Sequence, residues 1–179
     1  MKREPRKETL LVLGGARSGK SSWALRYVEG RYASPLFLAT AQVLDEEMAE
    51  RVRLHREARG PGWKVLEEPL AVPEALLCRC EGADAVLVDC LTVWLSNVML
   101  QLGEARVGDF QADLGDALEK SPRSAILVAN EVGTGIVPEH RLGRTFRDAA
   151  GLLNQRVAAL ADRVVFLTAG LPLWLKGGP

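Results

Sequence analysis

Short apolar runs alternate with amphipathic segments along the chain, and this alternation indicates strands and helices. Continuous apolar runs are typical of strands buried on both faces of a sheet, whereas apolar positions three or four residues apart are typical of helices. The pattern predicts strands over residues 10–13, 35–39, 83–88, 125–129 and 163–167. It predicts helices over residues 21–29, 45–58, 73–80, 94–102, 110–120 and 144–161. Residues 103–108 and 133–138 are expected to be loops, and residues 171–175 an edge strand or a tail.

This order of elements favours an α/β fold around a mainly parallel sheet, because helices connect strands that run in the same direction. The sequence has no internal repeat, low-complexity linker or abrupt change in composition. A single domain over residues 1–179 is therefore expected, with residues 1–8 as a flexible leader.

Composition narrows the classes of partner. The chain has 23 Lys and Arg against 23 Asp and Glu, so bulk binding to nucleic acid is not expected. Three cysteines without the common metal spacing are expected to be free thiols in a reducing cytoplasm. No apolar run approaches the ~20 residues of a membrane span, so no membrane insertion is expected.

A phosphate-binding loop follows the first predicted strand. The segment matches G-x-x-x-x-G-K-[ST] at every fixed position, and it lies between a buried strand and an amphipathic helix. Its glycines allow successive backbone N–H groups to converge on one anion, and the following helix directs its positive end to the same place. The motif predicts a nucleoside triphosphate site formed by Gly14, Gly15, Ala16, Arg17, Ser18, Gly19, Lys20 and Ser21. The fold class is therefore expected to be a P-loop NTPase-like, three-layer α/β domain with a mainly parallel central sheet.

Asp89 closes a later apolar strand, as the carboxylate of a Walker B segment does. Many strands end in Asp at a turn, but after a P-loop the functional interpretation is favoured. Ser21 and Asp89 are then the expected Mg²⁺ ligands, with GTP or ATP as the nucleotide and no tightly bound prosthetic group.

His55 shares one face of a predicted helix with Met48 and Val52, and arginines surround it. Periodicity alone favours a partly buried histidine among solvated arginines. The alternative is a nucleophile, because a neutral imidazole, which ordinarily titrates near ~6.5, can attack phosphorus and form a phosphoramidate. Neighbouring arginines would then offset the charge on the phosphoryl oxygens.

Several segments in order resemble the bifunctional adenosylcobinamide kinase / adenosylcobinamide-phosphate guanylyltransferase family of the cobalamin pathway. The likeness runs from about Leu10 to about Lys176. It is carried by the whole P-loop, the segments 38–41 and 44–48, the R-V-R-L-H run ending at His55, and Trp63 and Glu67. The segments 89–92 with Asn97, 130–138, 146–151 and 154–155 complete it. Two departures are Arg59-Gly60-Pro61, where the family often has Arg-Pro, and Asp89, where some members have Glu.

The resemblance implies a role for each matching residue. His55 would take GMP from GTP as a covalent intermediate, and Lys20 would anchor the phosphates. The guanine nucleotide would also be lined by Ala39, Thr40, Ala41, Arg56, Glu57, Ala58, Arg59, Glu67 and Asp89. The substrates would be GTP, ATP, adenosylcobinamide and its phosphate, and a homo-oligomer, a trimer, is expected.

The residue types leave other interpretations open. Thr40 could cap a turn, Glu67 could be a solvated charge, and Asn130-Glu131 could be catalytic or only shape a loop. Trp94 and Trp174 are expected to belong to the core or a subunit contact, His140 to the surface, and Cys90 to the buried surroundings of Asp89. A plain P-loop kinase with a structural His55, or a regulatory nucleotide-binding module, remain the competing functions.

Overall fold

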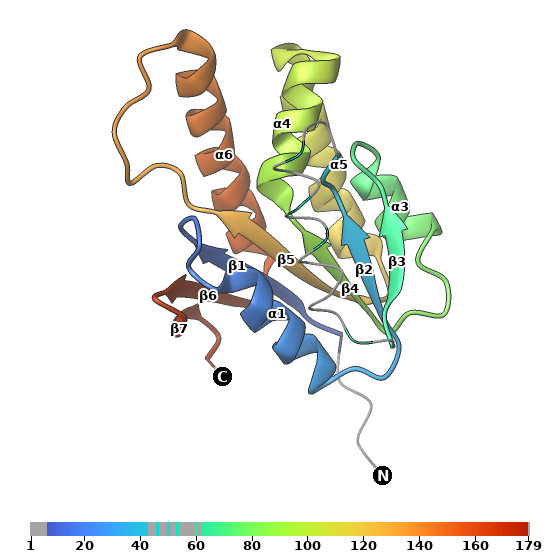
Figure 1. Ribbon diagram of the computed structural model, residues 1–179. Coiled ribbons are helices and arrows are strands. Elements are labelled where there is room, and N and C mark those ends of the chain that lie inside the picture. The colour runs from blue at the N-terminus through green and yellow to red at the C-terminus, as the bar shows by residue number, and fades with distance from the viewer. Residues whose placement is uncertain are drawn as a thin grey trace.

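The seven strands among the described residues form one sheet, in the order β3-β2-β4-β5-β1-β6-β7 (Figure 1). The computed structural model describes residues 7–42, 46, 50, 53, 60 and 62–178. The strands are β1 Thr9–Gly14, β2 Pro35–Ala39, β3 Lys64–Glu67, β4 Ala85–Asp89, β5 Ser124–Asn130, β6 Arg163–Thr168 and β7 Leu171–Lys176. All neighbours are parallel except β6 and β7, which form an antiparallel hairpin at one edge.

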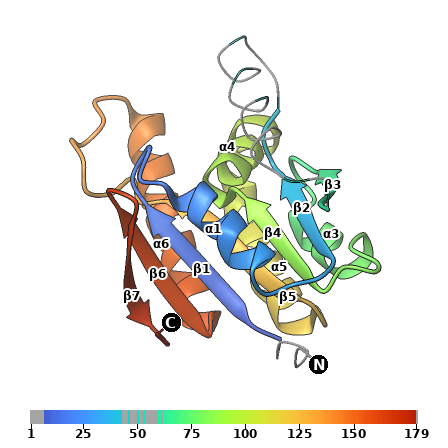
Figure 2. The ribbon, with the colours of Figure 1, turned by 60° about the horizontal axis from the view of Figure 1, so that its bottom comes forward.

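Helices cover both faces of the sheet, so the predicted three-layer arrangement is confirmed. The helices are α1 Lys20–Glu29, α3 Val72–Cys78, α4 Leu91–Leu102, α5 Val107–Lys120 and α6 Arg141–Leu160. Side chains of α1 pack on one face, around Leu10, Val12 and Phe37. The other four helices pack on the opposite face, around Leu11, Leu38 and Trp94 (Figure 2).

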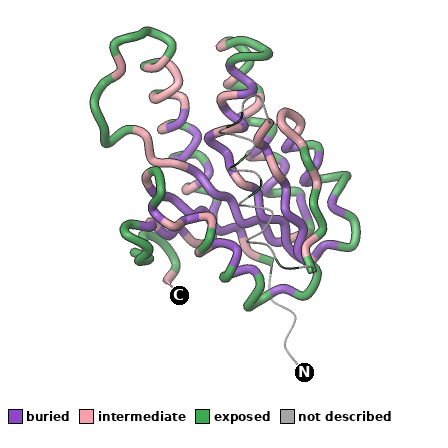
Figure 3. The backbone as a smooth tube through the Cα atoms, viewed as in Figure 1, coloured by how far each residue is buried: buried purple, intermediate pink, exposed green. Residues whose placement is uncertain are grey.

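The central strands are buried on both faces, which explains why they read as continuous apolar runs. Every residue of β1 is buried, and β5 is buried up to Asn130 (Figure 3). By contrast, β3 lies at the sheet edge, and three of its four residues are exposed. The pattern did not predict β3, because an exposed strand of four residues has no apolar run to reveal it.

Some predicted boundaries differ from the structure. The loop predicted over residues 103–108 is wrong, because a 3₁₀ turn occupies Glu104–Arg106 and α5 already begins at Val107. Gly108 lies inside α5, and Gly103, with a φ of 93°, separates α4 from the turn. Helix α6 begins at Arg141 rather than residue 144. Of the two alternatives for residues 171–175, the edge strand is confirmed, as β7. Of the helix predicted over residues 45–58, only residues 46, 50 and 53 are described, and all three are helical.

Lys7 and Glu8, at the end of the predicted leader, both bond to the rest of the fold. Lys7 Nζ donates to the carbonyl oxygens of Leu118 and Glu119 at the end of α5, where a cation complements the helix dipole. The carboxylate of Glu8 accepts from the hydroxyl groups of Tyr27 and Tyr32, each at 2.8 Å. Burial, with a smaller contribution from Glu8, raises the pKa of Tyr27 to about 12, so this hydroxyl remains a donor near neutral pH.

We predict that Glu8→Ala lowers the free energy of unfolding by about 2 kcal/mol, because two buried hydroxyl groups lose their acceptor. Urea unfolding measures this change. The variant that also carries Tyr27→Phe and Tyr32→Phe is the matched control, because it removes the orphaned hydroxyls and should recover at least half of the loss. A Glu8→Ala protein with the wild-type unfolding midpoint would contradict the prediction.

Candidate active site

The P-loop turns at a point where no side chain fits. Gly14 ends β1 between its neighbours Asn130 on β5 and Leu167 on β6. A Cβ atom on Gly14 would lie 2.5 Å from Ser18 Oγ and 2.6 Å from the backbone oxygen of Leu167. The backbone oxygen cannot move without breaking the sheet, so glycine is required here.

Two left-handed residues shape the loop after Gly14. Arg17 has a φ of 55° and Gly19 a φ of 89°, and Gly19 is the N-cap of α1. Alternating handedness of this kind directs neighbouring N–H groups into one concavity. Helix α1 starts at Lys20, so its positive end adds to the same anion site. The sequence-predicted context of strand, loop and helix is confirmed.

The C-terminal hairpin supports the loop from the other side. The Gly170 N–H donates to the Ser18 carbonyl oxygen at 3.0 Å, and the Glu131 N–H donates to the Gly14 carbonyl oxygen at 3.1 Å. Turns after β5 and β6 therefore fix the two ends of the P-loop. These contacts were not predicted from the sequence, because they join residues more than 100 positions apart.

The Lys20 side chain folds back over the P-loop. Its Nζ donates to the Gly15 carbonyl oxygen at 3.1 Å, and the residue is 9% exposed. Burial lowers the pKa of Lys20, while electrostatic interactions with Cys90 and Asp89 act in the opposite direction. The charge of Lys20 therefore interacts with the end of β4 as well as with the P-loop.

The register of the sheet places the other predicted residues on the same carboxyl edge. Ala39, the last residue of β2, pairs with Glu67 on β3 and with Asp89 on β4. Strand β2 separates Glu67, on β3, from β4, and β5 separates β4 from β1. At about 4.8 Å per strand, Asp89 is about 10 Å and Glu67 about 19 Å from β1 across the sheet. A nucleotide held at the P-loop would extend along this edge to reach Glu67.

Thr40 holds the turn that follows Asp89. Its hydroxyl donates to the Cys90 carbonyl oxygen and accepts from the Cys90 N–H, both at 2.8 Å. Thr40 is fully buried, and its own carbonyl oxygen accepts from the Asn97 amide at 2.8 Å. The Thr40 side chain therefore fixes this turn, and Ala41 follows it half-buried.

The remaining candidates separate into core and surface. Trp94 is buried and donates to the Leu70 carbonyl oxygen, Trp174 packs against Trp23, and His140 is exposed. All three cysteines are free, and burial raises the pKa of Cys90 to about 11, so Cys90 is a neutral thiol near pH 7 and a poor nucleophile.

His55, Arg56, Glu57, Ala58 and Arg59 lie outside the described residues.

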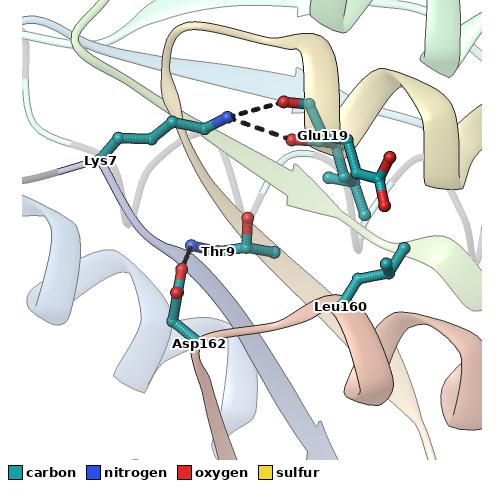
Figure 4. A pocket seen from close by; sticks show the side chains of 6 residues that line it. Lys7, Thr9, Glu119, Leu160 and Asp162 are labelled. Carbon is teal, nitrogen blue, oxygen red and sulfur yellow. Dashed lines mark hydrogen bonds between the residues drawn. The ribbon is translucent and has the colours of Figure 1, made fainter.

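A second hollow lies at the opposite, amino edge of the sheet. It is a cavity of about 250 Å³ lined by Lys7, Thr9, Leu118, Glu119, Leu160 and Asp162 (Figure 4). The Asp162 carboxylate accepts from the Thr9 N–H at 2.7 Å, and Lys7 caps α5, so these polar groups already serve the fold. This cavity is therefore a structural feature of the helix ends and not the phosphate site.

Hard oxygen ligands for a divalent cation are present beside the P-loop. Ser21 is the second residue of α1, and the Asp89 carboxylate interacts electrostatically with Lys20, the first residue of this helix. Hydroxyl and carboxylate oxygens suit Mg²⁺ held together with substrate phosphates. No group of three or more His, Cys, Asp or Glu residues that could hold a metal by itself occurs in the described part of the chain.

The fold and the loop together define a P-loop, NTPase-like α/β protein. A solved structure of an ATPase from the type III secretion system of pathogenic bacteria aligns with 90% of this chain and 51% of its own, with a TM-score of 0.59 and 16% identity. At this identity the likeness supports the fold alone.

The sequence comparison is more specific. The family described as cobinamide kinase / cobinamide phosphate guanyltransferase matches residues 10–175. The bifunctional adenosylcobalamin biosynthesis protein CobP of Pseudomonas aeruginosa is 44% identical over 94% of this chain and 98% of the relative. The corresponding CobU of Salmonella typhimurium is 38% identical over 93% of this chain and 99% of the relative. The chain belongs to the cobinamide kinase / cobinamide phosphate guanyltransferase family, as its motifs predicted.

We predict that Thr40→Val, which keeps the shape of the side chain, lowers the free energy of unfolding by about 1–3 kcal/mol. It leaves the buried N–H and C=O groups of Cys90 without their partner. Nucleotide affinity should also fall, because Asp89 loses its fixed position. Urea unfolding and a nucleotide titration measure the two effects.

Thr40→Ser should recover most of both losses, and Thr168→Val, at an exposed strand end, should leave both unchanged. Equal behaviour of Thr40→Val and Thr168→Val would show that the clamp on Cys90 has no role.

Proposed function

We propose that this protein performs both reactions for which its family is named. In the first, it phosphorylates the side-chain hydroxyl of adenosylcobinamide with ATP or GTP. In the second, it transfers GMP from GTP to the resulting phosphate and forms adenosylcobinamide-GDP. The observation that carries the proposal is the P-loop of Gly14–Ser21 with Asp89 on the same sheet edge, in a chain of this family.

The kinase step needs positioning and charge more than covalent chemistry. The acceptor hydroxyl attacks the γ-phosphorus, the bond to the β,γ-bridging oxygen breaks, and the hydroxyl proton passes to solvent or a nearby base. The P-loop N–H groups and Lys20 would hold the phosphates in line. Ser21 and Asp89 would hold Mg²⁺, which neutralises charge on the phosphate oxygens when it is bound.

The guanylyl transfer would proceed in two displacements on His55. A neutral ring nitrogen attacks the α-phosphorus of GTP, a P–N bond forms, and pyrophosphate leaves. A phosphate oxygen of the acceptor then attacks the same phosphorus, the P–N bond breaks, and His55 regains its lone pair. Arg56 to Arg59 would line the same nucleotide, together with Glu57 and Ala58 between them.

The connection that contains His55 joins two described ends. Gln42 follows β2 at the carboxyl edge, where its side chain accepts from the Gln101 amide at 2.6 Å. Trp63 precedes β3, packs on Phe37 and donates to Glu29 of α1 at 3.0 Å. The two described ends are therefore fixed by contacts, one at the carboxyl edge of the sheet and the other to α1.

Ala39, Thr40, Ala41 and Glu67 are proposed to border the nucleotide along the carboxyl edge. The register supports this for Ala39 and Glu67, which share a row with Asp89. Thr40 would act through the turn that it clamps. One P-loop would serve both reactions. It would present the γ-phosphate to the acceptor hydroxyl in the kinase step and the α-phosphate to His55 in the guanylyl transfer.

The trimer and the cytoplasmic location remain predictions. Leu171, Leu173 and Leu175 alternate along the edge strand β7 and are 68%, 57% and 58% exposed, an apolar strip that a second copy would cover. In the described part of the chain, no helix combines the length and the apolar character needed to cross a bilayer.

We predict that Lys20→Ala lowers the rates of both reactions by about 10²–10³, because both need the triphosphate anchored. The measurement is kinase and transferase turnover with GTP. Lys64→Ala, at an exposed position of β3, is the matched control and should keep both rates. Near-normal turnover in a folded Lys20→Ala protein would reject the P-loop as the site.

We predict that His55→Asn abolishes the acid-labile protein label from α-labelled GTP and the transfer of GMP, while phosphorylation of adenosylcobinamide survives. In the wild-type protein, label uptake should fall as the pH drops through ~6.5, where an ordinary imidazole protonates and loses its free lone pair.

His140→Asn, which changes an exposed histidine, is the control and should take up label like the wild type. A folded His55→Asn protein that still takes up label would exclude His55 as the nucleophile. Wild-type protein that phosphorylates adenosylcobinamide but neither takes up label nor transfers GMP would favour a plain kinase with a structural His55.

A further inference from the structure

Two buried polar atoms on the connection that follows β5 find no hydrogen-bond partner among the described residues. They are Asn130 Oδ1, at the end of β5, and Arg147 Nη1, on α6. Folded proteins pair nearly all buried polar atoms, so each exception requires an explanation. One atom is an acceptor and the other a donor, and one connection, residues 130–147, carries both.

The backbone of Asn130 is fixed next to the phosphate site. Asn130 pairs with Gly14 across β5 and β1. Its N–H donates to Thr92 Oγ1 at 2.7 Å, and its carbonyl oxygen accepts from the Asn154 amide at 3.2 Å. The backbone of Asn130 is therefore fixed on the strand that lies between β1, which leads into the P-loop, and β4, which ends at Asp89.

Arg147 lies beyond the carboxyl edge of the sheet on the same side of α6 as Asn154. Seven residues separate them, which is close to two full turns and a rise of about 10.5 Å. Asn154 contacts the end of β5, so Arg147 extends past that end, where α6 rises above the sheet (Figure 1). In the described residues no carboxylate pairs with Arg147.

The loop between Asn130 and Arg147 is braced at both ends. Glu131 donates from its backbone to Gly14, and Arg144 Nη1 donates to the Pro138 carbonyl oxygen at 3.1 Å. Pro138 packs so closely on α6 that a Cβ at Gly143 would lie 2.8 Å from it. Between these anchors, Ile136 is 96% and Val137 58% exposed. A loop fixed at both ends, which leaves the sheet beside Gly14, therefore exposes two apolar side chains.

We propose that residues 130–147 bind the acceptor substrate of both reactions, an inference that rests on the proposed function. Arg147 binds the phosphate of the phosphorylated acceptor through its planar pair of N–H donors. Asn130 Oδ1 accepts from the acceptor hydroxyl in the kinase step. Ile136 and Val137 contact the apolar body of the acceptor. In the transfer step, one oxygen of the bound phosphate forms the new bond to the α-phosphorus while the bond to His55 breaks.

The experiment compares Arg147→Gln with Arg156→Gln, which changes an exposed arginine of the same helix. We expect Arg147→Gln to raise the KM for adenosylcobinamide phosphate at least about tenfold, the loss expected for a charged hydrogen bond. Uptake of label from α-labelled GTP, which precedes acceptor binding, should stay within twofold of the wild type. Arg156→Gln should leave both quantities unchanged, and Arg147→Lys should raise the KM less than Arg147→Gln does.

Each other outcome has a distinct meaning. An unchanged KM in Arg147→Gln would overturn the proposal, and reduced label uptake would assign Arg147 to the nucleotide instead, which also overturns it. Wild-type protein that takes up no label and phosphorylates no acceptor would refute the proposed function itself. If circular dichroism shows that Arg147→Gln is unfolded, the Arg147→Lys variant, which keeps the charge and the aliphatic stem, replaces it. The KM of that variant for adenosylcobinamide phosphate is then compared with the wild-type KM.

Discussion

The lack of space around Gly14 is the constraint on which the rest of the site depends. Strand β1 lies between β5 and β6, and a side chain at its last residue would meet Ser18 and the backbone of Leu167. The chain therefore turns sharply there and enters α1, whose first N–H groups point back at the strand end. Strands β5 and β4 run parallel to β1, so their carboxyl ends bring Asn130 and Asp89 to the same edge of the sheet. The turn at Gly14 therefore lies beside functional groups from two further strands.

Polar clamps keep this edge in place. Thr40 fixes the turn after Asp89, Asn97 joins the end of β2 to the Pro69 carbonyl oxygen, and Thr92 holds the end of β5. Each of these side chains is buried, so its hydrogen bonds act in surroundings where unpaired groups are costly. The site is therefore supported by bonds between elements and does not depend on any single loop.

Local residue types were sufficient to predict the central strands, the P-loop and the position of Asp89. Buried parallel strands are apolar throughout, and a phosphate-binding turn needs glycines at fixed places, so both are visible in the sequence. Strand β3 was missed because Lys64, Val65 and Glu67 are exposed at the sheet edge. The turn at Glu104–Arg106 was taken for a loop because Gly103 and Gly108 flank it, although α5 accommodates Gly108. The clamp of Thr40 on Cys90 spans 50 residues, which no local pattern can reveal.

One nucleotide site, at the P-loop, is proposed to serve both reactions, and a crystal structure with Mg²⁺ and a non-hydrolysable GTP analogue would show where the nucleotide binds. We expect the phosphates to be held by the backbone N–H groups of residues 15–21, with Lys20 Nζ moved from the Gly15 carbonyl oxygen onto a phosphate oxygen. Phosphates bound elsewhere, such as at the cavity beside Lys7 and Asp162, with Lys20 still on Gly15, would contradict it.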